Sequence, residues 1–173
     1  MKIHKLIITA KKQFNKKQFE LTEKTCHSIL KKDPKNAEAL FLLGAIRLEQ
    51  ENYNKSKYFL DQALALAPHH LNANNYLGVV YLQTGVWDAA ETQFKKVLKI
   101  DPENINALVN LGNLSLNRKK WDLAEDLYKK ALSIDPGLGF ALNNLGELCF
   151  RQDRLDESLD YYQQALQYLP HDS

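Results

Sequence analysis

The sequence predicts an all-α protein made of repeated pairs of antiparallel helices, and three regularities support this prediction. The five prolines are spaced 34 residues apart: Pro34, Pro68, Pro102, Pro136 and Pro170. The two tryptophans, Trp87 and Trp121, have the same separation. Four glycines also keep it: Gly44, Gly78, Gly112 and Gly146. A period of about 34 residues is typical of stacked helix-turn-helix units, each too small to bury its apolar face alone.

Counting from the prolines divides the chain into five units, which predicts about ten helices in a single repeat domain over residues 3–172. The units are residues 3–36, 37–70, 71–104, 105–138 and 139–172. The first departs most from the pattern, since Thr9 and Ala10 stand where the later units have Leu-Gly. Terminal repeats are commonly atypical, so we interpret residues 3–36 as a degenerate first repeat.

Each unit should contain a helix A followed by a helix B. The fourth helix B has an apolar stripe at i, i+3, i+4, i+7 and i+8: Ala124, Leu127, Tyr128, Ala131 and Leu132. The pairs Asp88–Glu91 and Asp122–Glu125 have the spacing of a capping box, and we expect them to start the third and fourth helix B. The proline at the end of each unit cannot continue a helix and separates helix B from the next helix A.

Two recurring residue types indicate how the helices pack. Glycine inside a helix costs about 1 kcal/mol relative to alanine, so its return in four units predicts a close approach of helices A and B. Four aromatic residues share one position near the start of helix B: Phe19, Tyr53, Trp87 and Trp121. We expect these rings to pack between helices as structural residues.

The order of Leu-Gly, aromatic, Ala and Pro within a unit resembles the tetratricopeptide repeat (TPR) family. In the third unit these positions are Leu77, Gly78, Tyr81, Trp87, Ala90, Phe94, Val97 and Pro102. The resemblance covers nearly the whole chain. It implies a right-handed α-α superhelix, a TPR solenoid, in which one face of each helix A lines a concave groove that binds peptides or partner segments.

The fourth helix A carries four asparagines along one face: Asn106, Asn110, Asn113 and Asn117. A merely solvated face would favour Lys, Glu or Gln, which are better helix formers than Asn. Each amide offers both a donor and an acceptor, so a row of them can pair with the N–H and C=O groups of an extended peptide. The alternative is that these asparagines contact the adjacent repeat and that the working surface lies elsewhere.

By the resemblance, the equivalent faces of the other units complete the groove. Its expected residues are Phe41 in the second unit, Asn72, Asn75 and Tyr76 in the third, and Phe140, Asn143, Asn144 and Glu147 in the fifth. We expect Phe41, Tyr76 and Phe140 to anchor the partner. The carboxylate clamp of co-chaperone TPR domains is not reproduced, because the cations it needs are missing. The asparagine ladder of O-linked N-acetylglucosamine transferases is matched only at Asn110 and Asn144.

The charge is uneven along the chain. Residues 1–36 hold ten lysines and three acids, a balance of +7, and the remainder holds 13 basic and 18 acidic residues, a balance of −5; together they give +2. A basic end could contact an acidic partner, a nucleic acid or an anionic membrane. We favour a lysine-coated terminal repeat, because no aromatic residues alternate with the lysines as single-strand binding requires.

Other functional classes find little support. There is no apolar run near 18 residues and no secretory signal core, and Cys26 and Cys149 lack CxxC spacing, so we expect a cytoplasmic protein. No HExxH, GxSxG, phosphate-binding glycine loop or EF-hand is present. We therefore predict no enzymatic activity, cofactor, metal or small-molecule substrate.

The last helix B carries Leu159, Tyr162 and Leu166 on a face that a following repeat would cover. Solenoids need polar ends to stay soluble, so we expect either that more chain follows or that this face packs on a second copy. The function predicted is a scaffold for protein–protein interaction that binds a partner peptide or segment in the concave groove. The alternative is a non-catalytic TPR arm that recruits substrates to a larger transferase.

Overall fold

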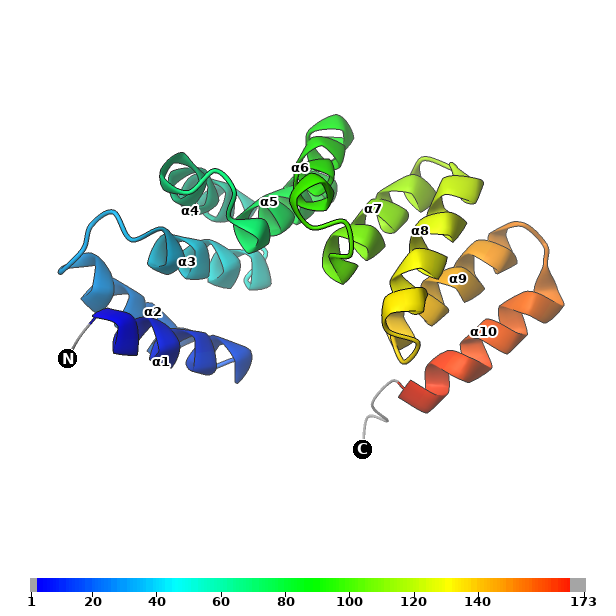
Figure 1. The fold of residues 1–173 in the computed structure, drawn as a ribbon, viewed down its shortest axis with the longest axis horizontal. Helices are drawn as coiled ribbons and strands as arrows, with labels where there is room; N and C mark the ends of the chain where they lie inside the picture. Colours follow the sequence, from blue (N-terminus) through cyan, green and yellow to red (C-terminus); the bar gives the residue numbers. More distant parts are fainter. Residues whose placement is uncertain (1–2, 169–173) are drawn as a thin grey trace. The chain divides into compact units, whose positions relative to one another are not determined.

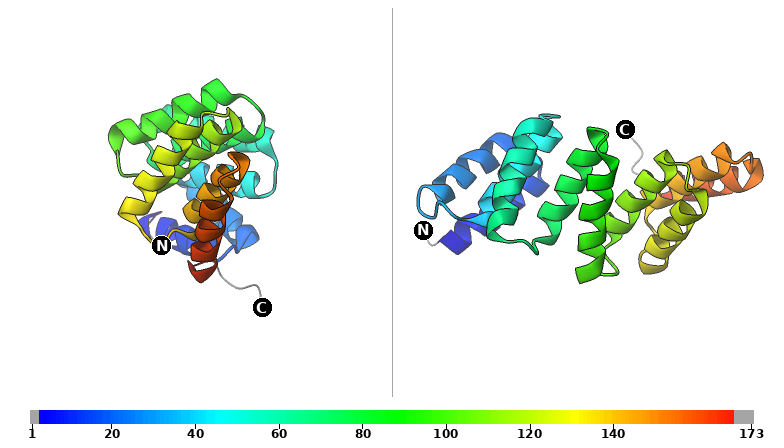
Figure 2. Two further views of the ribbon diagram at one scale, coloured as in Figure 1. Left: turned by 90° about the vertical axis from the view of Figure 1, so that its right-hand side faces the viewer. Right: turned by 90° about the horizontal axis from the view of Figure 1, so that it is seen from above.

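The computed structural model describes residues 3–168, and every element in that range is an α-helix (Figure 1). There are ten: α1 (Ile3–Asn15), α2 (Phe19–Leu30), α3 (Ala37–Glu49), α4 (Tyr53–Leu66), α5 (Leu71–Gln83), α6 (Trp87–Ile100), α7 (Ile105–Asn117), α8 (Trp121–Ile134), α9 (Gly139–Arg151) and α10 (Leu155–Tyr168). Consecutive helices form antiparallel pairs, which the two further views in Figure 2 also show. The predicted all-α fold of about ten helices is confirmed.

The chain forms two compact units, one up to Gln93 and one from Phe94, with the boundary inside α6. In the first unit α1 pairs with α2 and α3 with α4, and each pair contacts the next helix A. In the second unit α7 pairs with α8 and α9 with α10, and α8 also contacts α9. The single domain over residues 3–172 stays a prediction.

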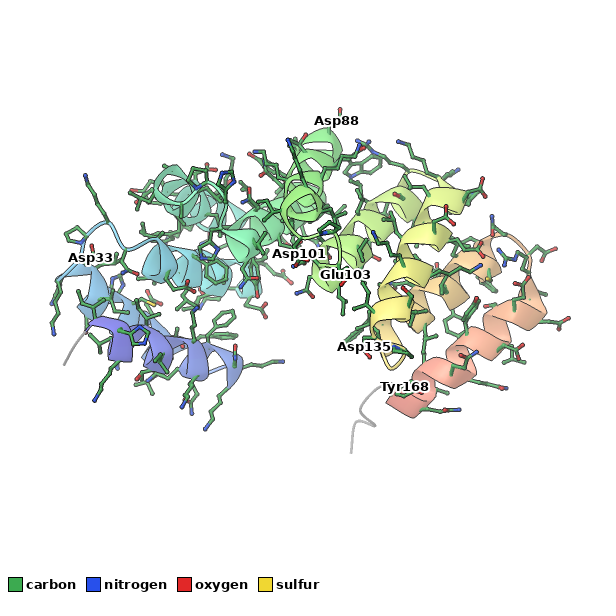
Figure 3. The ribbon with its side chains drawn as sticks, viewed as in Figure 1. Asp33, Asp88, Asp101, Glu103, Asp135 and Tyr168 are labelled. Carbon is green, nitrogen blue, oxygen red and sulfur yellow. The ribbon has the colours of Figure 1, made fainter. Side chains whose placement is uncertain are left out.

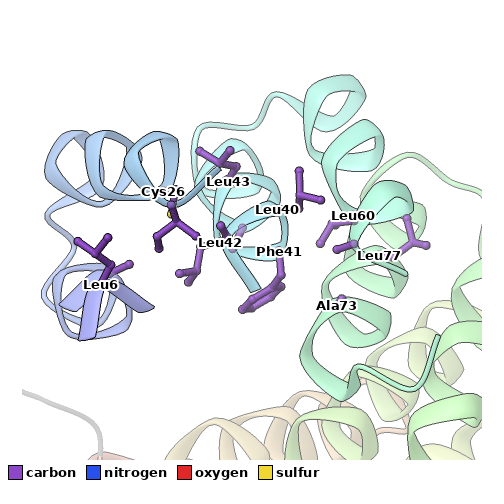
Figure 4. Close-up of a cluster of buried hydrophobic side chains, with 14 of the residues drawn as sticks. Leu6, Cys26, Leu40, Phe41, Leu42, Leu43, Leu60, Ala73 and Leu77 are labelled. Atoms are coloured by element: carbon purple, nitrogen blue, oxygen red, sulfur yellow. The ribbon is translucent and has the colours of Figure 1, made fainter. Parts of the chain in front are cut away.

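The core of the first unit centres on α3 (Figure 4). Every residue from Ala39 to Ile46 is buried, because α3 contacts α1, α2, α4 and α5. Its leucines pack with residues of the neighbouring helices: Leu6, Cys26, Leu60, Ala73 and Leu77. Because four helices surround α3, apolar side chains are needed on all sides of this helix.

The core of the second unit joins α7, α8 and α9. Its buried residues are Leu116, Ala124, Tyr128, Leu145, Leu148 and Cys149. Trp121 and Leu132 of α8 are partly buried against this cluster. The predicted stripe of α8 thus faces the core, with Ala124, Tyr128 and Ala131 fully buried.

The helix-A glycines allow helices A and B to approach closely, as predicted. A Cβ added to Gly44 would lie 2.8 Å from Leu60 Cγ, and one added to Gly146 would lie 2.8 Å from the Tyr162 ring. Both distances are shorter than carbon atoms tolerate. The close approach explains why a poor helix former recurs in the middle of helix A.

Each turn from helix A to helix B contains a residue with positive φ. These residues are 34 positions apart: Lys17, Glu51, Gly85, Lys119 and Asp153, with φ between 55° and 75°. The left-handed conformation reverses the chain in a short turn, and only glycine adopts it without steric cost. Four of the five repeats therefore carry a strained non-glycine residue here.

The predicted capping boxes are wrong. Helix α8 begins at Trp121 with Lys120 as its N-cap, which makes no side-chain capping bond, so Asp122 lies inside the first turn. Asp88 likewise lies in the first turn of α6, after Trp87. The left-handed turn residue makes the helix begin at the aromatic position, two residues earlier than a capping acid would place it. Acids in a first turn still interact favourably with the helix dipole.

The prediction that the aromatic position packs between helices holds for some repeats only. The rings of Phe14 and Phe19 pack with centroids 5.8 Å apart, and Tyr53 is partly buried on the first core. Trp87, however, is 40% exposed, so it is not an interior residue. Leu155 has the equivalent place in α10 and is 55% exposed.

The loops between hairpins repeat one capping arrangement. The Asn36 side chain accepts a hydrogen bond from the backbone N–H of Ala39 at 3.0 Å and donates one to Asp33 at 2.9 Å. Asn104 repeats this role at the start of α7 and donates to Asp101 at 3.0 Å. Asp33 and Asp101 lie in these loops in Figure 3. Each asparagine satisfies a backbone N–H that the first helical turn leaves without a partner.

His70 replaces the capping asparagine before the first helix of the third unit. Its Nδ1 accepts from the backbone N–H of Ala73 at 3.1 Å, and its Nε2 lies 3.3 Å from the Glu38 carboxylate. Because Nδ1 accepts, the neutral ring carries its proton on Nε2, toward Glu38. Burial opposes ionisation of Glu38, but hydrogen bonds from His70 and Lys11 outweigh it and lower the pKa of the carboxyl. This histidine has a structural role.

Candidate functional site

Helices α7 and α9 enclose a pocket of about 290 Å³ in the second unit. Five of the predicted groove residues line it: Asn106, Asn110, Asn113, Phe140 and Asn144. The asparagine row of α7 therefore forms one wall, and the start of α9 forms the other. Two successive repeats thus contribute amide groups and an aromatic ring to the same pocket.

A chain of hydrogen bonds orients two of these amides. The hydroxyl of Tyr128 donates to Asn113 Oδ1 at 2.7 Å, and Asn144 Nδ2 donates to the same oxygen at 2.8 Å. Burial raises the pKa of the Tyr128 phenol, so the hydroxyl keeps its proton and remains a donor. Since Asn113 Oδ1 accepts both bonds, the Asn113 amide has one orientation, and so does that of Asn144.

Phe140 gives the pocket its apolar rim. Its side chain is 67% exposed, the highest exposure among the large hydrophobic residues described in the chain. It is the second residue of α9, directly after the Leu138–Gly139 junction that begins the helix. Because this aromatic ring is exposed at the start of α9, it is available for contact with another molecule.

Three residues that the sequence also predicted are not among the pocket's lining residues. Asn117 and Asn143 are exposed on α7 and α9. Glu147 interacts within its own repeat: it accepts from Arg151 Nε at 2.7 Å and from the Tyr162 hydroxyl at 3.2 Å. Glu147 thus occupies, one repeat later, the place that Asn113 has beside Tyr128.

The remaining predicted residues, Phe41, Asn72, Asn75 and Tyr76, lie in the first unit. Phe41 is only 5% exposed, with its ring 4.9 Å from His70 and 5.3 Å from Tyr76, measured between centroids. Phe41 is therefore a core residue, and its expected role as a partner anchor is not supported. Asn75 is buried, Tyr76 is half-buried, and Asn72 is exposed.

The sequence reasoning missed three pocket residues: Ile105, Val109 and Leu138. Val109 was recognisable in principle, because it stands between Asn106 and Asn113 on the same side of α7. Leu138 could not be recognised in this way, because it lies in the loop before α9 and lines the pocket only because of the course that this loop takes. These apolar side chains make the pocket amphipathic.

Other kinds of site find no support in residues 3–168. Within that range no group of three or more His, Cys, Asp or Glu residues is placed to hold a metal ion. None of the described helices is both long enough and apolar enough to cross a membrane. Cys26 and Cys149 are buried free thiols, and burial raises the pKa of Cys26 to about 12, which makes a reactive thiolate unfavourable.

The fold and the pocket define a helical-repeat protein with an open, amphipathic surface site. Tetratricopeptide-repeat family models match residues 47–106 and 103–170, which together span 47–170. The chain belongs to the TPR family. Proteins of this family generally serve as scaffolds for protein interaction, and the matched models describe a repeat rather than a catalytic domain.

Solved structures share the fold at low sequence identity. The thermophilic TPR protein TTC0263 of Thermus thermophilus has a TM-score of 0.84 and 21% identity, covering 99% of this chain and 93% of that one. Pseudomonas aeruginosa pilF has 0.85 and 17%, covering 98% and 78%. MamA has 0.73 and 24%, covering 92% and 93%. A search of curated protein sequences gave no significant match.

Proposed function

We propose that this chain is a protein-interaction scaffold whose α7–α9 pocket binds an extended peptide segment of a partner protein. The observation that carries the proposal is the joint placement of asparagine amides and an exposed Phe140 around one pocket of about 290 Å³. This volume is just below the range of about 300–1,000 Å³ common for small-molecule sites. It suits a side chain of a peptide that lies across the surface.

The orientation of the amides supports recognition of a peptide backbone. Asn144 Nδ2 is engaged with Asn113, so the Asn144 Oδ1 lies at the other end of that amide and offers an acceptor. Asn113 Oδ1 accepts two bonds, so its Nδ2 lies on the opposite side and offers a donor. One acceptor and one donor match the N–H and C=O groups of an extended peptide without requiring a particular side chain.

The apolar part of the pocket supplies affinity. Phe140 at the rim, with Val109 and Ile105 in the wall, gives an apolar side chain a place to bury its surface. Aromatic residues in such positions commonly dominate binding energy, and the surrounding polar contacts contribute orientation. The preferred segment therefore carries one apolar residue flanked by backbone that remains free to hydrogen-bond.

The proposal is tested with linear peptides selected on the wild-type chain from a random phage-displayed library. Binding of a synthetic selected peptide is measured by isothermal titration calorimetry for wild type and for Asn113→Ala/Asn144→Ala. Loss of two hydrogen bonds, each worth about 1 kcal/mol, should weaken binding roughly 10- to 30-fold. Phe140→Ala should weaken it by at least a similar factor.

Asn143→Ala is the matched control, because Asn143 is exposed on the same helix but does not line the pocket. It should bind the peptide like wild type. Equal binding by wild type, the Asn113/Asn144 variant and Phe140→Ala, with unfolding curves confirming that all three are folded, would refute the proposal. The transferase arm and the cytoplasmic location stay predictions.

A further inference from the structure

Helix α10 carries a line of exposed leucines. Leu155, Leu159 and Leu166 are 55%, 57% and 59% exposed, and their spacing of four and seven residues places them on one side of the helix. Single exposed leucines are ordinary on a protein surface, but three in line form a continuous apolar face. We refer to these three residues as the α10 face.

Helix α8 shows what covers the same positions one repeat earlier. Leu155 and Leu166 correspond, at a distance of 34 residues, to Trp121 and Leu132. Both pack against the core cluster that includes Leu145 of α9. The α10 face is therefore the surface on which a following helix A docks, and within residues 3–168 no helix occupies that place.

Helix α1 has the complementary position, because no helix B precedes it among the described residues. Its outer side carries Lys5, Ile8 and Lys12, all exposed, with Ile8 at 42%. Their spacing of three and four residues puts them on one side of α1. Lys12 corresponds, four repeats earlier, to Leu148, which α9 buries in the second core. We refer to Lys5, Ile8 and Lys12 as the α1 face.

Charge decides which surface fits the α10 face. Asp156 and Asp160 are exposed alongside the leucines, whereas lysines flank Ile8 on the α1 face. Two α10 faces packed together would bring four aspartates close, and two α1 faces would do the same with lysines. Pairing α10 with α1 instead brings opposite charges together, in keeping with the balance of +7 in residues 1–36 and −5 in the remainder.

We propose that the α10 face of one molecule docks on the α1 face of a second copy. Leu159 packs against Ile8 and the aliphatic stems of Lys5 and Lys12, whose ammonium groups reach Asp156 and Asp160. The contact is heterologous, so a pair keeps a free α1 face on one molecule and a free α10 face on the other. Association then continues into longer assemblies unless it closes into a ring.

The test is sedimentation velocity of the full chain across a wide range of concentration and salt. The mean mass should rise with concentration and fall with added salt, because exposed ion pairs are screened. The variants Asp156→Lys/Asp160→Lys and Lys5→Glu/Lys12→Glu should each lose self-association, with thermal unfolding showing that both are folded. Mixing the two variants should restore association, since each supplies the charge that the other now needs.

Lys31→Glu/Lys32→Glu is the matched control. It makes the same change in net charge within the same basic repeat, on exposed residues at the end of α2, and should associate like wild type. A wild-type chain that stays monomeric at every concentration overturns the proposal. So does self-association that survives Lys5→Glu/Lys12→Glu, because contact between two α10 faces would not require α1.

Discussion

The aromatic ring of Tyr128 occupies the space that a side chain at residue 112 would need. A Cβ added to Gly112 would lie 2.5 Å from Cε1 of Tyr128. The same Tyr128 sends its hydroxyl to Asn113, the next residue of α7. Removing the side chain at one position of helix A thus lets helix B approach and places a donor beside the pocket.

Gly112→Ala should destabilise the protein although alanine is the better helix former. Overpacking against the Tyr128 ring costs about 1–3 kcal/mol, which exceeds the gain of about 1 kcal/mol from helix propensity. Urea unfolding monitored by circular dichroism measures the difference. Asn117→Ala, at an exposed position of the same helix, should change stability by no more than about 0.5 kcal/mol. A Gly112→Ala protein as stable as wild type would show that the ring moves aside without cost.

Lys119→Gly should stabilise the protein. Lys119 has a φ of 57°, in the left-handed region, where a side chain costs about 1 kcal/mol relative to glycine. Gly85, at the equivalent turn with a φ of 75°, already has the favourable residue, so Gly85→Ala should destabilise by a similar amount. No atom lies within 4 Å of a Cβ added at Gly85, so that change reports backbone strain without a clash. Opposite signs for the two variants in thermal unfolding are the expected result.

His70→Ala should lower the free energy of unfolding by about 1 kcal/mol through loss of the N-cap of α5. His70→Asn should retain most of that stability, because Asn36 and Asn104 cap α3 and α7 in the same way. The comparison is made by urea unfolding at neutral pH. Equal losses in the two variants would indicate that contacts of the imidazole ring, rather than the cap, hold this turn.

Glu125 should make stability depend on pH in the acidic range. Hydrogen bonds from Arg154 and Lys129 lower the pKa of Glu125 from 4.5 to about 2. The folded state therefore favours the charged carboxylate, and this stabilisation is present above pH 4.5 and is lost as pH falls toward 2. Glu125→Gln should be less stable than wild type by about 1 kcal/mol near neutral pH, and the difference should disappear at the acidic end. Asp126→Asn, an exposed change on the same helix, is the control for the loss of one negative charge. A pH-independent difference for Glu125→Gln would argue against the ion pair.

The periodicity of the sequence predicted the helices well because each repeat solves the same packing problem with the same residues. Gly112 and Tyr128 stand 16 positions apart, as Gly146 and Tyr162 do, so one spacing describes one contact in both repeats. The helix starts were less predictable. Asp122 is of a residue type that often caps helices, but the left-handed conformation of Lys119 decides where the turn ends and the helix begins. A positive φ at a lysine cannot be recognised from the amino-acid sequence.

The pocket was predicted in part, for a related reason. The asparagine face of α7 follows from helical spacing, and Asn110, Asn113 and Asn144 all line the pocket. Phe41 was misassigned because its position in the repeat suits a groove, whereas α3 is surrounded by four helices and buries it. The bond from Tyr128 to Asn113 also escaped prediction, since it depends on how closely two helices approach.

Asn113 receives one hydrogen bond from its own hairpin and another from the hairpin that follows. The Asn113 amide thus lines the pocket and also joins two successive repeats by a hydrogen bond. A ligand that competes for Asn113 Oδ1 would weaken the contact between the two repeats, and one that favours the same amide orientation would strengthen it. A ligand in the α7–α9 pocket would therefore change how firmly these two repeats are held together.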